Sequence, residues 1–472
     1  MAVDSSVTPV PPRGDGRRAF PVRFVAPLMW GAALNPVNSS IIATSLVAIA
    51  HAFGVTAAQT ATLVAAVYVA SAVAQPTMGK LAASFGARRI FLIGMGIVTV
   101  AGVVGALAPS FEWLIVSRVL IGIGTSAGYP TAMSLIRHRA DRLGTGIPGA
   151  VLGTMSIAAQ VTSALGLPLG GVLVGVWDWR AVFAVNIPLG LAGIVMTLLW
   201  IPKDVMVPSD RVGSQRAREL TSAIDPLGVV LFAAPVVALI LFLQDLRSPT
   251  WWLLGAIALA AGLMVAWELK ARHPFIDVRS LARNGPLLRT YARAMLTQTV
   301  SYAVLYGYVQ WLEEGRGLSA SVSGLVMLPM TVVGAIGAAL VSRRALVRGP
   351  LVASAIAVTF GGGALTFVTG QTNVLLLIGL SLVFGVVLGM TSVSNQAALY
   401  DQTTAGEIGV ASGLLRTSSY LGAILASALI AFSFPQRATD AGLHSMAWIT
   451  VGLGIIVLLF VLLDQSIPRR AR

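Results

Sequence analysis

Two aromatic and two amide side chains recur along one apolar stretch of the chain. Gln298, Tyr302, Tyr306 and Gln310 stand four residues apart in an otherwise hydrophobic run. Residues at this spacing lie on one face of a helix, so the four side chains form a polar-aromatic stripe. Rings stack and amides form hydrogen bonds, which suits the binding of small amphipathic organic molecules. The alternative is that these groups only bond neighbouring helices together.

Further polar side chains interrupt other apolar runs. Arg118 is the most informative, because a guanidinium inside hydrocarbon costs at least about 3 kcal/mol and should face a cavity or a partner. The alternative is that Arg118 lies near the outer boundary and extends to water. The other candidates for a substrate-lining role are Asn35, Asn38, Asn395 and Arg416. None of the 18 acidic residues falls in the middle of a predicted span, although proton pumps generally place a carboxylate or histidine in the membrane pathway.

The composition indicates the environment in which these groups lie. The 472 residues are 56% hydrophobic and only 11% charged, with a mean hydropathy of +0.84. This much apolar surface predicts an all-α polytopic membrane protein. Runs long enough to cross a bilayer predict fourteen spans, near residues 24–50, 57–79, 90–108, 113–134, 147–174, 181–201, 226–243, 251–267, 291–312, 322–341, 351–369, 373–397, 409–432 and 443–463.

The basic residues predict the orientation of these spans. With both termini in the cytoplasm, the inner segments hold 26 of the 32 lysines and arginines, and the outer loops hold only Arg180, Arg247, Arg316 and Arg437. This asymmetry follows the positive-inside rule. The net charge of +14 is therefore an orientation signal, and no nucleic-acid partner is expected. Because the sequence has no cysteine and no Walker, metalloprotease or serine-hydrolase motif, we expect no cofactor, metal site or enzymatic activity.

A polar stretch at 203–225 and a basic stretch at 268–290 bracket two of the spans, with six spans before them and six after them. We predict a disordered cytoplasmic tail at 1–22, a first bundle at 23–202, a linker with two extra transmembrane helices at 203–289, a second bundle at 290–464 and a tail at 465–472. A weak repeat supports this division: GKLAASFGARR follows the second span and GAALVSRRALVRG follows the tenth.

Residues 163–190, SALGLPLGGVLVGVWDWRAVFAVNIPLG, carry the most specific pattern. Gly166, Gly170 and Gly171 place small residues where two helices can approach closely in lipid, and Pro168 allows the helix to bend. The WDWR segment brings two indoles to a membrane–water boundary. The stretch resembles the fifth–sixth helix signature of the major facilitator superfamily, in its fourteen-span drug:proton antiporter branch. The proline stands one place later than in the antiporter motif of that branch.

A second motif is similar to the cytoplasmic loop motif of the same superfamily. Within GKLAASFGARR, Gly79, Gly86, Arg88 and Arg89 match that motif, and Ala83 replaces its aspartate. The resemblance implies a tight glycine turn whose charges latch the inner face when it closes. An ordinary basic loop required by orientation is the alternative.

Two further positions bear on protons. Arg118 followed by Gly122 and Gly124 resembles the R-x-x-x-G-x-G motif of the family, whose arginine is linked to proton movement. Asn38 stands where the branch usually has its proton-linked aspartate, and asparagine does not titrate. Proton antiport is therefore implied by the resemblance and not by the local residues.

The resemblance implies a monomeric transporter in the cytoplasmic membrane that exports small amphipathic drugs or natural products. It would work by alternating access between the two bundles, in contact with the lipid bilayer and in exchange for protons. Two alternatives remain open. One is a facilitator or uptake carrier without proton antiport, favoured by Asn38 and Ala83. The other is a membrane scaffold or sensor that transports nothing.

Overall fold

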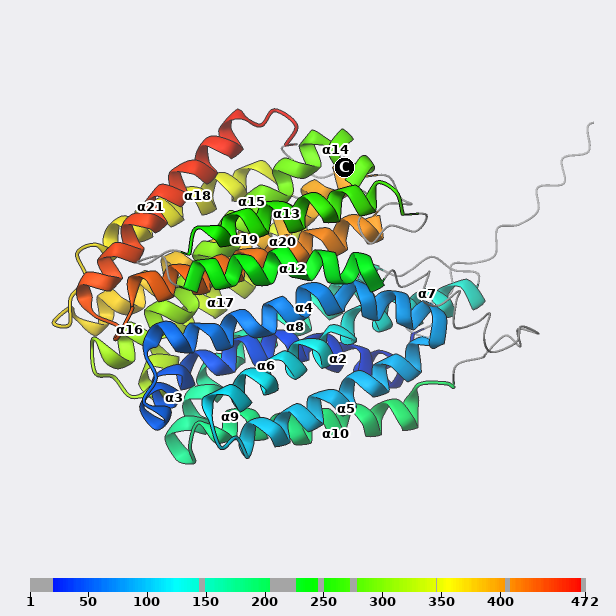
Figure 1. Ribbon diagram of the computed structural model, residues 1–472, viewed down its shortest axis with the longest axis horizontal. Coiled ribbons are helices and arrows are strands. Elements are labelled where there is room, and N and C mark those ends of the chain that lie inside the picture. Colours follow the sequence, from blue (N-terminus) through cyan, green and yellow to red (C-terminus); the bar gives the residue numbers. More distant parts are fainter. Residues whose placement is uncertain are drawn as a thin grey trace, which may run out of the picture.

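The computed structural model describes residues 20–143, 149–203, 226–244, 250–271, 278–344, 346–403 and 408–467, and these are folded mainly into helices (Figure 1). The all-α fold class expected from the composition is therefore confirmed. Most of the predicted tails, 1–22 and 465–472, and most of the polar part of the 203–289 linker lie outside the described residues.

The first half of the chain forms one group of packed helices. Its elements are α2 Val22–Ile41, which continues through the short turn η1 Ile42–Ser45 into α3 Leu46–Phe53, then α4 Ala57–Phe85, α5 Ala87–Ala106, α6 Phe111–Ser126, α7 Gly128–Arg142, α8 Gly149–Val176, α9 Arg180–Ala184 and α10 Asn186–Trp200. Thr56 and Gln59 form a capping box at the start of α4, and Gly86 ends that helix at a φ of 97°, a conformation that favours glycine.

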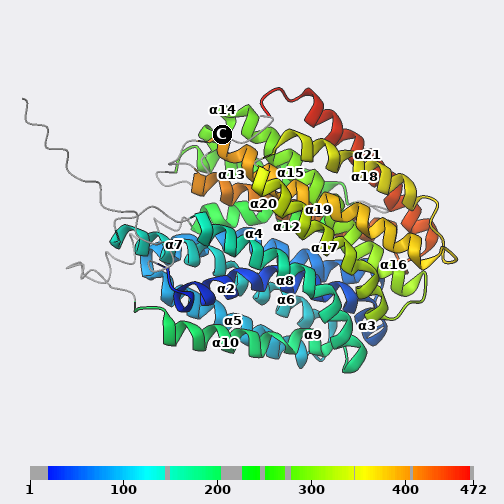
Figure 2. The same ribbon diagram turned by 180° about the vertical axis from the view of Figure 1, so that it is seen from behind.

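The second half forms a similar group. Its elements are α14 Val278–Arg283, α15 Gly285–Ala303, the π-helical turn η2 Val304–Tyr308, α16 Val309–Glu314, α17 Ala320–Arg344, α18 Arg348–Leu365, α19 Val374–Gln402, α20 Ile408–Ser433 and α21 Asp440–Leu463. Figure 2 shows this group from the opposite side, stacked along the first group.

Corresponding helices pack in the same way in both halves. The pairs α2 with α8, α4 with α6 and α5 with α10 of the first half recur as α15 with α20, α17 with α19 and α18 with α21 of the second. The halves then meet through α8 against α17 and through α20 against α4. The packing thus repeats once along the chain, and the two contacts between the halves are equivalent in that repeat.

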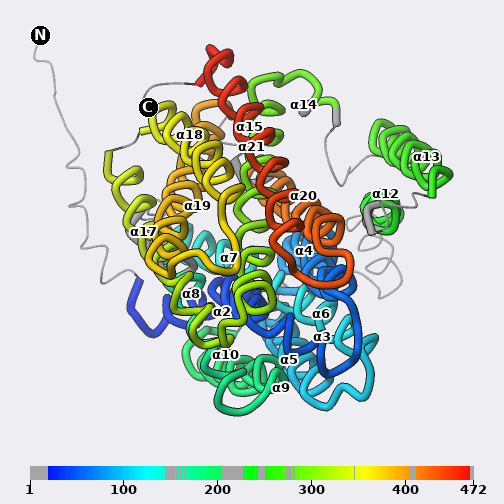
Figure 3. The backbone as a smooth tube through the Cα atoms, turned by 90° about the vertical axis from the view of Figure 1, so that its left-hand side faces the viewer, coloured from blue at the N-terminus to red at the C-terminus, as the bar shows by residue number. Residues whose placement is uncertain are grey.

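Two helices lie outside this repeat. The helices α12 Pro226–Gln244 and α13 Trp252–Glu268 pack on each other at the edge of the molecule, as Figure 3 shows. Only α12 has extensive contacts with the two halves, where it lies against α4 and α20.

Among the described residues, nine helical segments are long and apolar enough to cross a membrane. The helix α13 and parts of α8 and α12 are apolar but shorter. The structure therefore describes a multi-span membrane protein, while the count of fourteen spans and the cytoplasmic placement of both termini stay predictions.

Candidate functional site

Four tyrosines from both halves meet where α4 and α20 pack together. Tyr68 lies on α4, Tyr302 on α15, Tyr306 in η2 and Tyr420 on α20. Ring centroids are 5.0 Å apart between Tyr68 and Tyr302, 5.8 Å between Tyr68 and Tyr420, and 5.9 Å between the stacked Tyr302 and Tyr306. These separations are typical of interacting aromatic rings. We call this group the tyrosine cluster.

The hydroxyl groups of the tyrosine cluster join the halves. The Tyr306 hydroxyl donates to the carbonyl oxygen of Ser39 at 2.8 Å. Because its one hydrogen is used in that bond, the Tyr306 hydroxyl accepts from the Tyr68 hydroxyl at 2.9 Å. The Tyr420 hydroxyl donates to Oε1 of Gln75 at 2.5 Å. Each of these bonds connects the first half to the second, so the cluster is part of the contact that any relative movement of the halves must rearrange.

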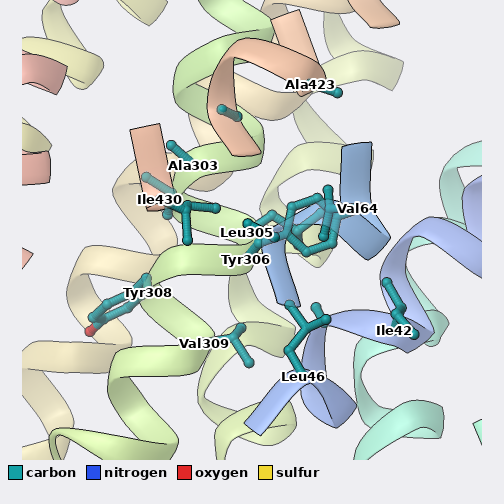
Figure 4. Close-up of a cluster of buried hydrophobic side chains, with 14 of the residues drawn as sticks. Ile42, Leu46, Val64, Ala303, Leu305, Tyr306, Tyr308, Val309, Ala423 and Ile430 are labelled. Carbon is teal, nitrogen blue, oxygen red and sulfur yellow. The ribbon is translucent and has the colours of Figure 1, made fainter. Parts of the chain in front are cut away.

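The π-helical turn η2 directs Tyr306 into this contact. A π turn adds a residue to the helical register, and such turns occur frequently at functional sites. Figure 4 shows Tyr306 pointing toward Val64 and Leu46 of the first half, while Tyr308 points away from them. Tyr308 instead donates to the carbonyl oxygen of Leu377 at 3.3 Å, within the second half.

Arg118 lies next to the tyrosine cluster and is 1% exposed, so it does not extend to water at the outer boundary. Its Nε donates to the carbonyl oxygen of Leu63 at 3.1 Å, and one terminal nitrogen donates to the carbonyl oxygen of Asn38 at 3.3 Å. The other terminal nitrogen is buried without a hydrogen-bond partner. Because Tyr306 bonds the next carbonyl, that of Ser39, Arg118 and Tyr306 contact consecutive residues of α2.

Arg416 also lies at the junction of the halves. Its guanidinium carbon sits 3.5 Å from the ring centroid of Tyr129, so a cation–π contact joins α20 to α7. This pair is offset from Arg118 along the molecule, since eleven residues separate Arg118 from Tyr129 on α6 and α7, a rise of about 16 Å.

The asparagines of α2 are held by hydrogen bonds within the first half. Asn38 is buried, and its amide donates to Oδ1 of Asn186 at 2.7 Å and to the carbonyl oxygen of Leu34 at 3.0 Å. Asn35 is half-buried and donates to Thr125 at 3.1 Å and to Ser71 at 3.3 Å. Asn38 therefore bonds two helices together, and Asn35 is the more accessible of the two.

The remaining predicted site residues lie apart from one another. Gln298 packs half-buried against Gly422 of α20. Gln310 follows the π turn and is 1% exposed, with a buried amide nitrogen that has no partner. Asn395 accepts from Nε of the buried Arg293 at 2.8 Å. The stripe predicted from i+4 spacing thus brings Tyr302 and Tyr306 into one cluster, while the amides at its two ends occupy different surroundings.

The glycines of the 163–190 stretch lie where α8 crosses helices of both halves. A Cβ on Gly166 would meet Ser40 at 2.4 Å, and one on Gly170 would meet the carbonyl oxygen of Ile41 at 2.4 Å. A Cβ on Gly171 would meet the carbonyl oxygen of Ala320 at 2.6 Å, from the second half. Pro168 lies inside α8 opposite Gly324 of α17.

This crossing is one of three contacts near the same end of the molecule. The Ser321 hydroxyl donates to the carbonyl oxygen of Gly171 at 2.8 Å, and the backbone nitrogen of Ala57 donates to the carbonyl oxygen of Gln436 at 3.0 Å. The segments α3 and α16 also pack together. The structure therefore closes the end that the sequence predicts to face outward.

The glycine turn predicted between the second and third spans is present. Gly86 separates α4 from α5 and has a positive φ. A Cβ added to Gly79 would lie 3.6 Å from Pro130. Arg88 donates to the carbonyl oxygen of Leu198 at 3.2 Å, and Arg89 lies in the first turn of α5. These residues join helices of the first half.

Several residues of the site escaped sequence reasoning. Tyr68, Ser71 and Gln75 follow one face of α4 at spacings of three and four residues, the same signal that singled out the ninth span. Tyr129 and Asn186 had no such signal, since each is a single polar group whose partner lies far along the chain.

Comparison of the sequence with models of known protein families identifies the family of the chain. Residues 28–427 match the model of the Major Facilitator Superfamily. The chain belongs to the major facilitator superfamily. Members of this superfamily are transporters rather than enzymes, which agrees with the lack of a catalytic motif.

Relatives and solved structures extend this assignment. The chain is 33% identical to the MFS-type transporter YwoD of Bacillus subtilis, over 95% of this chain and 98% of the relative. It is 27% identical to the tetracenomycin C resistance and export protein of Streptomyces glaucescens, over 92% of this chain and 80% of the relative. A bacterial homologue of the human drug peptide transporters shares the fold with a TM-score of 0.65 at 14% identity, covering 93% of this chain and 96% of that one.

In this major facilitator protein, the tyrosine cluster and Arg118 form a candidate site between the two groups of helices. Aromatic rings from both halves contact one another, with Tyr302 stacked on Tyr306 and the ring of Tyr68 tilted against Tyr302. The buried Arg118 lies beside them, and every hydroxyl bond of the tyrosine cluster given above crosses the junction. Such a site can bind an aromatic body by stacking and orient it by hydrogen bonds and charge.

Proposed function

We propose that the protein exports small amphipathic molecules across the cytoplasmic membrane by alternating access. The observation that carries this proposal is the tyrosine cluster, whose rings and hydroxyls belong to both halves. A molecule that stacks between these rings must interrupt contacts such as that of Tyr306 with Ser39. Binding and relative movement of the halves are then linked by the same atoms.

Export is favoured over uptake by the relatives. The tetracenomycin protein is a resistance and export protein, and the match with it covers most of both chains. The contacts of Gly171 with Ser321 and of Ala57 with Gln436 support a state closed toward the predicted outside. A substrate from the cytoplasm would load in this state.

The test is a resistance and accumulation screen in an efflux-deficient bacterial host, with and without an uncoupler. We expect the protein to lower accumulation of at least one aromatic compound and the uncoupler to abolish that effect. Substitution Tyr306→Ala should remove it as well. Accumulation that is the same with the protein, with Tyr306→Ala and with an empty vector, across a broad panel, would favour the scaffold or sensor alternative.

A second candidate is a carrier that moves its substrate without proton antiport. It is favoured by the position of the acids, because all nine described aspartates and glutamates lie in loops or within two residues of a helix end, at Glu112, Asp141, Asp178, Glu268, Glu313, Glu314, Asp401, Asp440 and Asp464. A proton carried through the core would need a group that titrates there.

A further inference from the structure

Among the residues that the structure describes, two arginines at the junction of the halves have no acidic partner. Arg118 is buried with one terminal nitrogen unbonded, and Arg416 stacks on Tyr129. Within the part of the chain that the structure describes, neither guanidinium has a carboxylate oxygen within 4.0 Å. In contrast, the buried Arg293 has an acidic partner, because its guanidinium lies 3.9 Å from the carboxylate of Asp464.

An uncompensated cation in a membrane core is costly, and such groups face a partner, a pathway or a ligand. Carbonyl oxygens from Leu63 and Asn38 satisfy part of the Arg118 guanidinium, but they carry no net charge. The remaining donor needs an acceptor, and an anion would provide both the acceptor and the missing charge.

The surroundings define the rest of that anion. Arg118 and Tyr306 contact consecutive carbonyls of α2, so a group that binds the arginine lies beside the tyrosine cluster. The stacked Tyr302 and Tyr306 rings, with Tyr68 against Tyr302, suit a flat aromatic body. Arg416 stacks on Tyr129, which lies further along α6 and α7 toward the predicted cytoplasmic end, where an anion from the cytoplasm would meet it first.

We propose that the substrate is an amphipathic organic anion, with an aromatic body for the tyrosine cluster and an acidic group for Arg118, and that the membrane potential drives its export. The inference rests on the proposed function and names its substrate class and driving force. A potential of about 100 mV, negative inside, favours the exit of a monovalent anion by roughly 50-fold. No proton needs to be exchanged, which agrees with the lack of a carboxylate at mid-depth in the described spans.

Binding tests the substrate class with three probes that share one ring system. We would measure affinities of the purified full chain for 1-naphthalenesulfonate, 1-naphthalenemethanol and 1-naphthyltrimethylammonium, which differ in charge. We expect the sulfonate to bind at least about tenfold more tightly than the alcohol and the cation to bind most weakly. Arg118→Gln should weaken binding of the sulfonate more than binding of the alcohol and so remove most of this preference, while Arg118→Lys should keep part of it.

Two further variants guard against a folding defect. Arg416→Gln changes a half-buried side chain, so its fold should persist even where that of Arg118→Gln does not, and we expect it to weaken sulfonate binding about threefold or more. Arg180→Gln is the matched control, because Arg180 is half-exposed and paired with Asp178 at 3.0 Å, and it should change nothing. Equal binding of the three probes, or a preference for the cation, would overturn the proposal.

Transport tests the driving force in proteoliposomes with a potassium gradient and valinomycin. We expect the rate of sulfonate uptake to rise when the lumen is made positive and to stay the same when a pH gradient of about one unit is applied. If the alcohol or the cation is transported and the sulfonate is not, export stands as the function and the anion proposal fails. If the sulfonate moves only with a pH gradient, the potential-driven mechanism fails. If it binds through Arg118 but no probe is transported, the proposed function itself fails.

Discussion

At the scale of single residues, the hydroxyl of Tyr306 carries the contact between the halves. Tyr306→Phe keeps the ring and removes two hydrogen bonds, to Ser39 and Tyr68, each worth about 1 kcal/mol. We expect transport of an identified substrate to fall about fivefold or more. Tyr308→Phe is the matched control, because its single bond to Leu377 stays inside the second half. Equal effects of the two substitutions on transport would show that the bonds across the junction have no special role.

Asn38 and Asn186 form a buried pair whose worth can be measured. Replacing either alone by leucine removes the hydrogen bond between them and should cost about 1–2 kcal/mol of stability. The double variant should cost less than the sum of the single variants, because each single variant already removes the same hydrogen bond. Thermal unfolding of the purified variants gives the comparison. Additive losses would mean that the two amides do not interact in the folded protein.

At the scale of helices, the close crossing of α8 and α17 depends on Gly171. A methyl group there would meet the carbonyl oxygen of Ala320 at 2.6 Å, which only a shift of backbone can relieve. We expect Gly171→Ala to open the predicted outer end. The chain has no cysteine, so spin labels on cysteines at His51 and Gln436 can report the distance across that end. Gly262→Ala, on α13 with nothing within 4 Å, should leave the distance unchanged.

A second helix-level contact fixes the end of α21 beside α15. Asp464 is buried, pairs with Arg289 at 3.1 Å and lies 3.9 Å from Arg293. Burial alone would raise the pKa of Asp464, but hydrogen bonds from Ser466 and Arg289 and the charge of Arg289 outweigh it and lower the pKa below its ordinary value of 3.8.

This lowered pKa predicts how stability depends on pH. Because the folded protein favours the charged carboxylate, the stabilisation is complete above about pH 5 and is lost as pH falls through the lowered pKa. Asp464→Asn should lower the melting temperature at pH 7 and reduce the further loss between about pH 5 and pH 3. The exposed Asp178→Asn should change neither quantity, and a wild-type melting temperature that stays flat over this range would contradict the prediction.

How much of this could be read from the sequence differs between elements and contacts. Long apolar runs predict the helices. The glycines of α8 predict a close approach to a neighbouring helix, because small residues in a membrane helix allow two backbones to pack closely. The partner of a polar group did not follow, because Asn38 and Asn186 meet across 148 positions. The π turn also stayed hidden, since nothing in VLYGY distinguishes it from an α-helical turn, yet it decides where Tyr306 points.

At the scale of the whole molecule, the packing repeat turns one helix contact into a pair. The crossing of α8 with α17 and that of α20 with α4 are equivalent, and the tyrosine cluster lies on the second of them. A movement that separates one pair at one end can bring the other closer at the opposite end, which is the geometry that alternating access requires. The peripheral helices α12 and α13 belong to neither of these two helix pairs, and of the two only α12 has extensive contacts with both halves.

The predicted fourteen-span topology requires both α12 and α13 to cross the membrane. If they do, Thr250 between them faces outward and Ala271 after them faces the cytoplasm. In intact cells, a membrane-impermeant maleimide should label Thr250→Cys and should label Ala271→Cys only after lysis. Ser110→Cys and Arg343→Cys serve as controls for the predicted outer and inner sides, on a chain with no cysteine of its own. Labelling of Thr250→Cys only after lysis, with both controls as expected, would mean that α12 and α13 lie along the inner surface and that the chain crosses twelve times.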